Sequence, residues 1–173
     1  TIELGTHGDL IFTANWVAII YPITYVMNGG ANPAANPATY TVETLPITLA
    51  APAQAGYFFT GWTSGAVIAA GTTGPLTFTA TWSAPIVYDI TYILGGGTNA
   101  VGNPGTYTVE SPTITLAAAT RTGYDFLGWT PAGTIPAGST GDVTFTARWS
   151  YSLVYTVTFL VFGGFDMGFV VVI

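Results

Sequence analysis

The chain has 173 residues, of which only 6 % are charged, against roughly a quarter in an ordinary soluble domain. Two arginines, no lysine and eight carboxylates give a formal net charge of −6, so the chain lacks the basic stripe that nucleic-acid binding requires. It also has no cysteine, which excludes disulfides and thiolate metal sites. So weakly charged a surface repels its own copies little and favours self-association; the alternative is a threonine-rich monomeric stalk.

The chain repeats itself. Ile23 returns as Ile90, 67 residues later, and the register holds without a gap from residue 23 to residue 83. Tandem repetition predicts an array of similar modules that stack on their neighbours. The chain divides into four parts, which are 1–16, the C-terminal part of a repeat; 23–82, a full repeat; 90–149, a second full repeat; and 155–173, the first strand of a further repeat with an apolar tail.

The N-terminal part should be the last strand of a repeat, because Gly5–Trp16 matches Gly71–Trp82 and Gly138–Trp149. One interpretation is that the chain is a window on a longer array, cut without regard to repeats. The other is that the ends are real, in which case strand addition to an open sheet edge would join this part to another subunit. The residues expected to make that joint here are Gly8, Leu10, Phe12 and Trp16.

Within a repeat, β-branched and aromatic runs separated by Gly, Pro and Asn predict short strands. The expected strands of the first repeat, in chain order, are Ile23–Met27, Tyr40–Glu43, Ile47–Leu49, Gly56–Trp62 and Gly74–Trp82. No window shows a helical period, although Ala50–Ala55 could form one short turn. The predicted fold class is therefore all-β to β-rich α+β, with small tandem modules in an elongated array and little or no helix.

Large aromatic residues recur at fixed register, which is typical of a core. A sugar-stacking role for the tryptophans is the alternative. The expected core comprises Tyr40, Tyr57, Phe59, Trp62, Phe78 and Trp82, with their copies Tyr107, Tyr124, Phe126, Trp129, Phe145 and Trp149.

The C-terminal stretch Tyr151–Ile173 is the most apolar part of the chain, but glycines and Asp166 interrupt it, so we expect a strand rather than a membrane span. Its segment Tyr155–Phe159 matches Tyr88–Tyr92, the first strand of a repeat. The segment Phe165–Ile173 would have to substitute for the missing middle of a repeat. The residues expected to contact another subunit here are Tyr155, Val157, Phe159, Val161, Phe169 and Val171.

Three motifs resemble the Listeria–Bacteroides repeat, the family of the internalin B-repeat. They are Asn28-Gly29-Gly30, the run Arg121–Trp129 with its Gly-Tyr-x-Phe-x-Gly-Trp core, and Phe145–Trp149. The resemblance implies a small β-grasp-like fold, a bacterial or archaeal surface or secreted protein, and a role as a spacer or adhesive stalk without catalytic residues. The first repeat departs from the pattern, with Gln54-Ala55 in place of Arg121-Thr122, and family members usually carry more charge.

Residues suited to catalysis are sparse. His7 is the only histidine, and threonines occupy its place in both full repeats. No pair of carboxylates has the spacing of a calcium-binding loop, although calcium at a junction between repeats stays open. We therefore expect neither an enzyme nor a cofactor or metal site.

These features predict a structural, extracellular or cell-surface protein that forms a filament, sheath or fibre through end-to-end strand contacts. Its expected partners are copies of itself, without nucleic acid and without membrane insertion. The alternative is an adhesin stalk or binding module of a longer surface protein, which recognises a glycan or a host protein.

Overall fold

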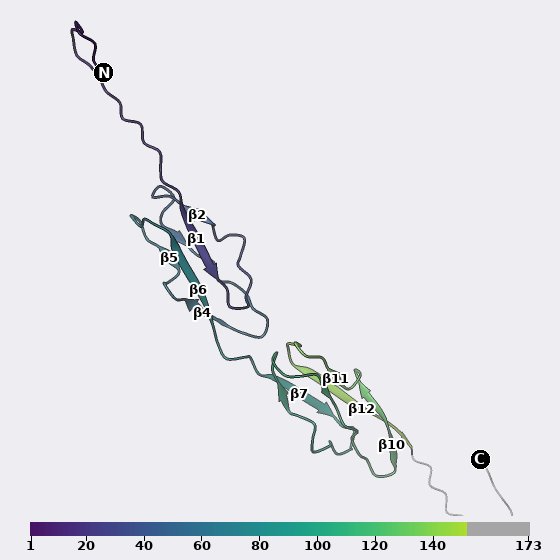
Figure 1. The fold of residues 1–173 in the computed structure, drawn as a ribbon. Coiled ribbons are helices and arrows are strands. Elements are labelled where there is room, and N and C mark those ends of the chain that lie inside the picture. The colour runs from purple at the N-terminus through teal and green to yellow at the C-terminus, as the bar shows by residue number, and fades with distance from the viewer. Residues whose placement is uncertain (152–173) are drawn as a thin grey trace, which may run out of the picture. The chain divides into compact units, whose positions relative to one another are not determined.

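A computed structural model describes residues 1–151, and those described residues form strands and no helix, as predicted (Figure 1). Contacts divide the chain into two units. The first comprises Thr1–Val87 together with Thr108–Glu110, and the second comprises Tyr88–Tyr107 and the residues from Ser111 onward. The strands of the first unit are β1 Tyr21–Val26, β2 Thr39–Tyr40, β3 Ile47–Thr48, β4 Phe59–Trp62, β5 Val67–Ile68 and β6 Leu76–Trp82. Those of the second unit are β7 Tyr88–Ile93, β8 Thr106–Tyr107, β9 Ile114–Thr115, β10 Tyr124–Thr130, β11 Thr134–Ile135 and β12 Val143–Tyr151.

Both units have the same sheet topology. In the first, the strand order is β2-β1-β6-β4, with β1 and β6 parallel at the centre and antiparallel strands at both edges. The second unit repeats this arrangement with β8-β7-β12-β10. Parallel neighbours need a long crossover connection, and the rest of each repeat supplies it. That crossover carries a two-stranded ribbon, β3 with β5 or β9 with β11.

The glycine of each Gly-Trp pair lies at a β-bulge. The register between β4 and β6 shifts between Phe59 and Gly61, and the register between β10 and β12 shifts between Phe126 and Gly128. Both glycines have positive φ, 142° for Gly61 and 121° for Gly128, which a residue with a side chain adopts only under strain. The bulge explains why a glycine precedes the core tryptophan in both repeats.

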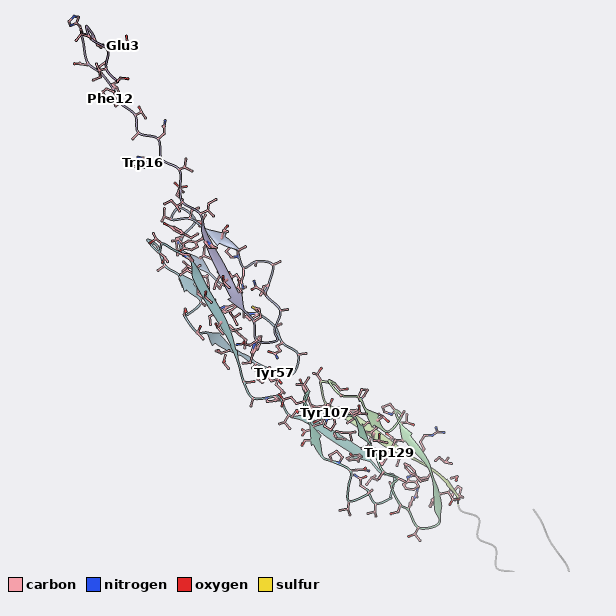
Figure 2. All side chains as sticks on the ribbon, viewed as in Figure 1. Glu3, Phe12, Trp16, Tyr57, Tyr107 and Trp129 are labelled. Carbon is pink, nitrogen blue, oxygen red and sulfur yellow. The ribbon has the colours of Figure 1, made fainter. Side chains whose placement is uncertain are left out.

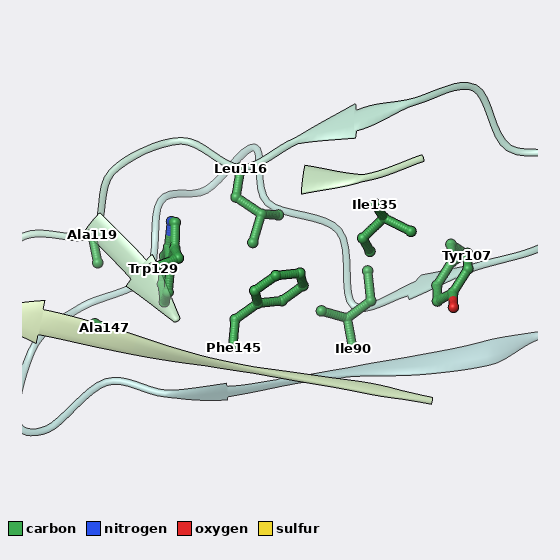
Figure 3. Packing of buried hydrophobic residues seen from close by; sticks show 8 residues of the cluster. All are labelled: Ile90, Tyr107, Leu116, Ala119, Trp129, Ile135, Phe145 and Ala147. Carbon is green, nitrogen blue, oxygen red and sulfur yellow. The ribbon is translucent and has the colours of Figure 1, made fainter. Parts of the chain in front are cut away.

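Each unit has its own hydrophobic core between the sheet and the ribbon. In the second unit, Phe145 and Ile90 point from the central strands toward Leu116 and Ile135 (Figure 3). Phe145 is 1 % exposed and its counterpart Phe78 is 3 % exposed. The prediction of an aromatic core is confirmed for six residues that are buried and for four that are partly buried and pack against them. The buried ones are Tyr40, Trp62, Phe78, Tyr107, Trp129 and Phe145, and the partly buried ones are Phe59, Trp82, Phe126 and Trp149.

The aromatic contacts of the first repeat recur in the second with nearly the same distances between ring centroids. Phe59 lies 5.4 Å from Trp62 and 5.6 Å from Trp82 between ring centroids, edge to face. The matching distances around Phe126 are 5.3 Å to Trp129 and 5.4 Å to Trp149. Trp62 and Trp129 are 6 % and 8 % exposed, so they belong to the core and do not form sugar-stacking platforms.

Two core assignments were wrong. Tyr57 and Tyr124 are only half-buried and lie outside both core clusters. Tyr57 comes before β4 begins, and Tyr124 is the first residue of β10, where its ring packs beside Tyr151 at 5.0 Å. Position at the start of a strand, beyond the ribbon that covers the core, leaves these rings partly in solvent.

The strand expected over Tyr40–Glu43 is shorter than predicted. It ends at Tyr40 because the chain turns at Thr41–Thr44, where the Thr44 amide donates to the Thr41 carbonyl at 3.1 Å. The Thr41 amide in turn donates to the Thr44 hydroxyl at 3.0 Å, so side-chain hydrogen bonds replace the sheet ladder. The strands β5 and β11 were not predicted, since two residues are too few for alternation to show.

An asparagine in each repeat ties the loop after the first strand to the ribbon. The Asn36 amide group donates to Asn32 Oδ1 at 2.8 Å and to the Ala50 carbonyl at 3.1 Å, and its Oδ1 accepts from the Ala50 amide at 2.7 Å. Asn103 makes the same three bonds with Asn99 and Ala117. The available signal was the presence of an asparagine at the same position of both repeats.

Candidate functional site

The N-terminal segment, residues 1–20, carries large apolar side chains exposed to solvent. Phe12 is 75 % exposed and Trp16 is 91 % exposed, whereas Leu10 is 47 % exposed (Figure 2). This described segment contains no strand, and its only regular feature is a turn in which the Thr6 amide donates to the Glu3 carbonyl at 3.3 Å. Gly8 has a φ of 106° and is exposed.

The same sequence is buried where a full repeat surrounds it. The counterparts of Phe12 are Phe78 and Phe145, which are 3 % and 1 % exposed on β6 and β12. Trp16 corresponds to Trp82, whose Nε1 donates to the Met27 carbonyl at 3.0 Å, and to Trp149, whose Nε1 donates to the Leu94 carbonyl at 2.9 Å. Residues 8–16 therefore have the side chains of a central strand but form no strand in the described structure.

The full repeats show which strand pairs with this sequence. The closing strand pairs in parallel with the first strand of its own repeat, with Leu76 opposite Ile23 and Phe78 opposite Tyr25. In the second repeat Val143 lies opposite Ile90 and Phe145 opposite Tyr92. A first strand that paired with the N-terminal segment would thus place apolar residues opposite Leu10 and Phe12.

The other six predicted contact residues, Tyr155, Val157, Phe159, Val161, Phe169 and Val171, lie outside the described residues. Within residues 1–151, no three His, Cys, Asp or Glu side chains are grouped so as to hold a metal ion. The same part of the chain contains no helix long and apolar enough to cross a membrane.

The second repeat carries an open hollow of about 500 Å³ that the sequence analysis did not predict. Its lining consists of Gly96, Thr98, Thr120, Arg121, Thr122 and Tyr124. The Arg121 guanidinium carbon lies 3.5 Å from the centroid of the Tyr124 ring, so the cation is stacked on the aromatic face. The available signal was the difference between Arg121-Thr122 and Gln54-Ala55 at equivalent positions.

The model of the Listeria-Bacteroides repeat domain matches the chain twice, over residues 21–81 and 88–148. The chain belongs to the Listeria-Bacteroides repeat family. This confirms the resemblance carried by the Gly-Tyr-x-Phe-x-Gly-Trp motif, and the bulge and the buried tryptophan described above are the structural meaning of that motif.

No curated protein matches the chain. Among solved structures, the chain is similar to domains 3-4 of the Streptococcal High Identity Repeats in Tandem (SHIRT) from a cell surface protein. The match has 15 % sequence identity, covers 77 % of this chain and 98 % of the other, and has a TM-score of 0.26. A likeness this weak carries no conclusion about the Listeria-Bacteroides repeats of this chain.

Proposed function

We propose that the chain is a structural tandem-repeat protein of the cell surface or extracellular space, which assembles with its own copies by β-strand addition. One observation carries the proposal: Phe12 and Trp16 are exposed, while their counterparts in both full repeats pack in or against a core. The strand that would complete the sheet is Tyr155–Phe159 of another copy, since this segment matches the first strand of a repeat.

The register follows from the full repeats. The pairs Ile90 with Val143 and Tyr92 with Phe145 correspond to Val157 with Leu10 and Phe159 with Phe12. Every residue in the two corresponding pairs is apolar, so pairing in this register, with Phe165–Ile173 in the place of the ribbon, would bury the side chains that Leu10 and Phe12 now expose. A charged fraction of 6 % adds little repulsion between copies.

The proposal is tested by the mass of the chain in solution, measured by light scattering, for the natural chain and two variants. Burial of a phenylalanine contributes about 1.5–3 kcal/mol, so Phe12→Ser should weaken association by about tenfold or more. The matched control is Ile11→Ser, since Ile11 is 93 % exposed and corresponds to threonines on the solvent face of β6 and β12.

We expect multimers of the natural chain and of Ile11→Ser, and a smaller mean mass for Phe12→Ser. A monomeric mass for all three chains would overturn the proposal, because the sheet would then be completed within one molecule or not at all. Equal loss of mass in both variants would also overturn it, since association would not depend on the core face.

The second candidate function is an adhesin stalk that binds a glycan or a host protein. The observation that favours it is the polar hollow around Arg121 in the second repeat, three of whose polar lining residues are alanines at the equivalent positions of the first repeat. The two functions are compatible, because the hollow uses none of residues 1–16.

A further inference from the structure

The residues around Arg121 differ between the two repeats. Of the six residues that line the hollow, only Gly96 and Tyr124 have the same residue at the equivalent place, Gly29 and Tyr57. The other four are all polar in the second repeat and mostly alanine in the first. Thr98, Thr120, Arg121 and Thr122 correspond to Ala31, Ala53, Gln54 and Ala55.

The backbone beneath these side chains is the same in both repeats. The Thr98 amide donates to the Thr120 carbonyl at 2.7 Å, and the Ala31 amide donates to the Ala53 carbonyl at 2.9 Å. The fold therefore does not require the polar set, since the first repeat forms the same bridge between alanines. The difference lies in the surface that the side chains present.

In the first repeat Gln54 stands at the position of Arg121. The Gln54 amide lies against Gly29, so close that a Cβ added to Gly29 would lie 2.9 Å from Gln54 Nε2. Gln54 Oε1 is buried without a hydrogen-bond partner. In the second repeat a Cβ added to Gly96 would lie 3.6 Å from Arg121 Nε, so the two side chains lie over equivalent glycines and differ in their charge.

In the second repeat the Arg121 guanidinium is stacked on Tyr124, but no carboxylate of the described residues pairs with its charge. Arg121 makes no ion pair with a carboxylate of the described residues, and the Thr98, Thr120 and Thr122 hydroxyls make no hydrogen bond within them. Stacking on Tyr124 orders the guanidinium before a ligand arrives, so less entropy is lost when its N–H groups bind.

From this arrangement we infer that the hollow binds a carboxylated sugar, such as a uronic acid unit of an acidic glycan. A planar guanidinium binds a carboxylate through two parallel hydrogen bonds. Three threonine hydroxyls on the same rim can donate to and accept from sugar hydroxyls. A hollow of about 500 Å³ is also much larger than one inorganic anion needs. This inference rests on the second candidate function, whose ligand class it names.

The test is saturation-transfer NMR on the full chain, which observes the ligand and works whether or not the chain assembles. Glucuronic acid is compared with glucose, which lacks only the carboxylate. We expect saturation of glucuronic acid at concentrations where glucose shows little, and weaker binding as salt is added. Arg121→Gln, which installs the residue of the first repeat, should weaken binding by about tenfold or more.

The matched control is Arg148→Gln, which changes the net charge equally at an exposed position outside the hollow. It should bind as the natural chain does. If Arg121→Gln fails to fold, Thr122→Ala should reduce binding while leaving Arg121 stacked. Binding lost equally in both arginine variants would overturn the inference, because overall charge would then explain it.

Three other outcomes would also overturn the inference. The first is equal saturation of glucose and glucuronic acid. The second is inorganic sulfate that binds as tightly as glucuronic acid and displaces it from the hollow. The third is an acidic peptide that binds where glucuronic acid does not. Since the two sugars are compared on the same protein sample, failure here leaves the strand-addition proposal standing, and a monomeric chain leaves this test intact.

Discussion

Replacing Gly97 with alanine should destabilise the second repeat, because the closing tryptophan packs directly on this glycine. A Cβ at Gly97 would lie 2.5 Å from Trp149 Cζ2 and 2.9 Å from the Thr120 carbonyl oxygen, well inside ordinary contact distance. Neither neighbour can retreat freely. Trp149 Nε1 donates to the Leu94 carbonyl at 2.9 Å, and the Thr120 carbonyl accepts from the Thr98 amide at 2.7 Å.

Overpacking of this kind costs about 1–3 kcal/mol, and a lost hydrogen bond would add about 1 kcal/mol. Gly97 does not have a positive φ, so alanine suffers no backbone strain there. The smaller entropy of the unfolded chain offsets the loss by about 0.4–1 kcal/mol. The expected net change is therefore a loss of about 1–3 kcal/mol, carried almost wholly by the contact with Trp149.

The assay is urea unfolding followed by circular dichroism and tryptophan fluorescence. With a slope of about 1 kcal/mol/M for a domain of this size, the midpoint should fall by about 1–3 M. The control is Gly102→Ala, where a Cβ would meet nothing within 4 Å, and it should be neutral or slightly stabilising. Equal midpoints for the two variants would refute the packing of Trp149 on Gly97.

Three further predictions follow from the repeated contacts. Gly30→Ala should weaken the first repeat as Gly97→Ala weakens the second, since its Cβ would lie 2.3 Å from Trp82 Cζ2; unchanged urea unfolding would contradict this. Asn103→Ala removes three hydrogen bonds and should cost about 1–3 kcal/mol of stability. Asn99→Ala removes only one of the three and should cost less. A larger loss for Asn99→Ala in urea unfolding would contradict the role given to Asn103. Burial raises the pKa of Tyr25, and burial with the nearby Tyr88 and Asp142 raises that of Tyr107. The folded state therefore holds these protons more tightly than the unfolded chain, so the contribution of these tyrosines to the free energy of unfolding should be constant below pH of about 10 and fall above it. A free energy of unfolding that rises with pH above about 10, measured in urea, would contradict this.

The repeated sequence allowed much of the fold to be predicted. The alternation of Leu76, Phe78 and Ala80 correctly predicted a strand with one buried face, because burial on one side of a sheet requires a period of two. The parallel pairing of β1 with β6 was not predictable, since strand partners are chosen by the whole repeat and not by either strand.

The positions that the sequence analysis missed depend on three-dimensional neighbours. Asn36 looks like a loop residue until the Ala50 backbone lies beside it, and Tyr57 looks like a core residue although it precedes its strand. The hollow around Arg121 was signalled only by a mismatch between repeats. The site itself depends on the stacking of Arg121 on Tyr124, which the sequence does not show.

Strand addition between copies is tested most directly by disulfide cross-linking, since the natural chain has no cysteine. Thr91 lies opposite Thr144 in the second repeat, so Thr91→Cys with Thr144→Cys should cross-link within one molecule and serves as the positive control. The corresponding pair across the joint is Ile11→Cys with Thr158→Cys. Ile11→Cys with Val157→Cys is the mismatched pair, because a slip of one residue places the side chains on opposite faces.

The measurement is the ladder of covalent species on a non-reducing gel after mild oxidation. Strand addition in the register of the full repeats predicts dimers, trimers and longer species for Ile11→Cys with Thr158→Cys, and few for the mismatched pair. A cross-linked positive control, with the joint pair remaining monomeric, would contradict assembly through these strands.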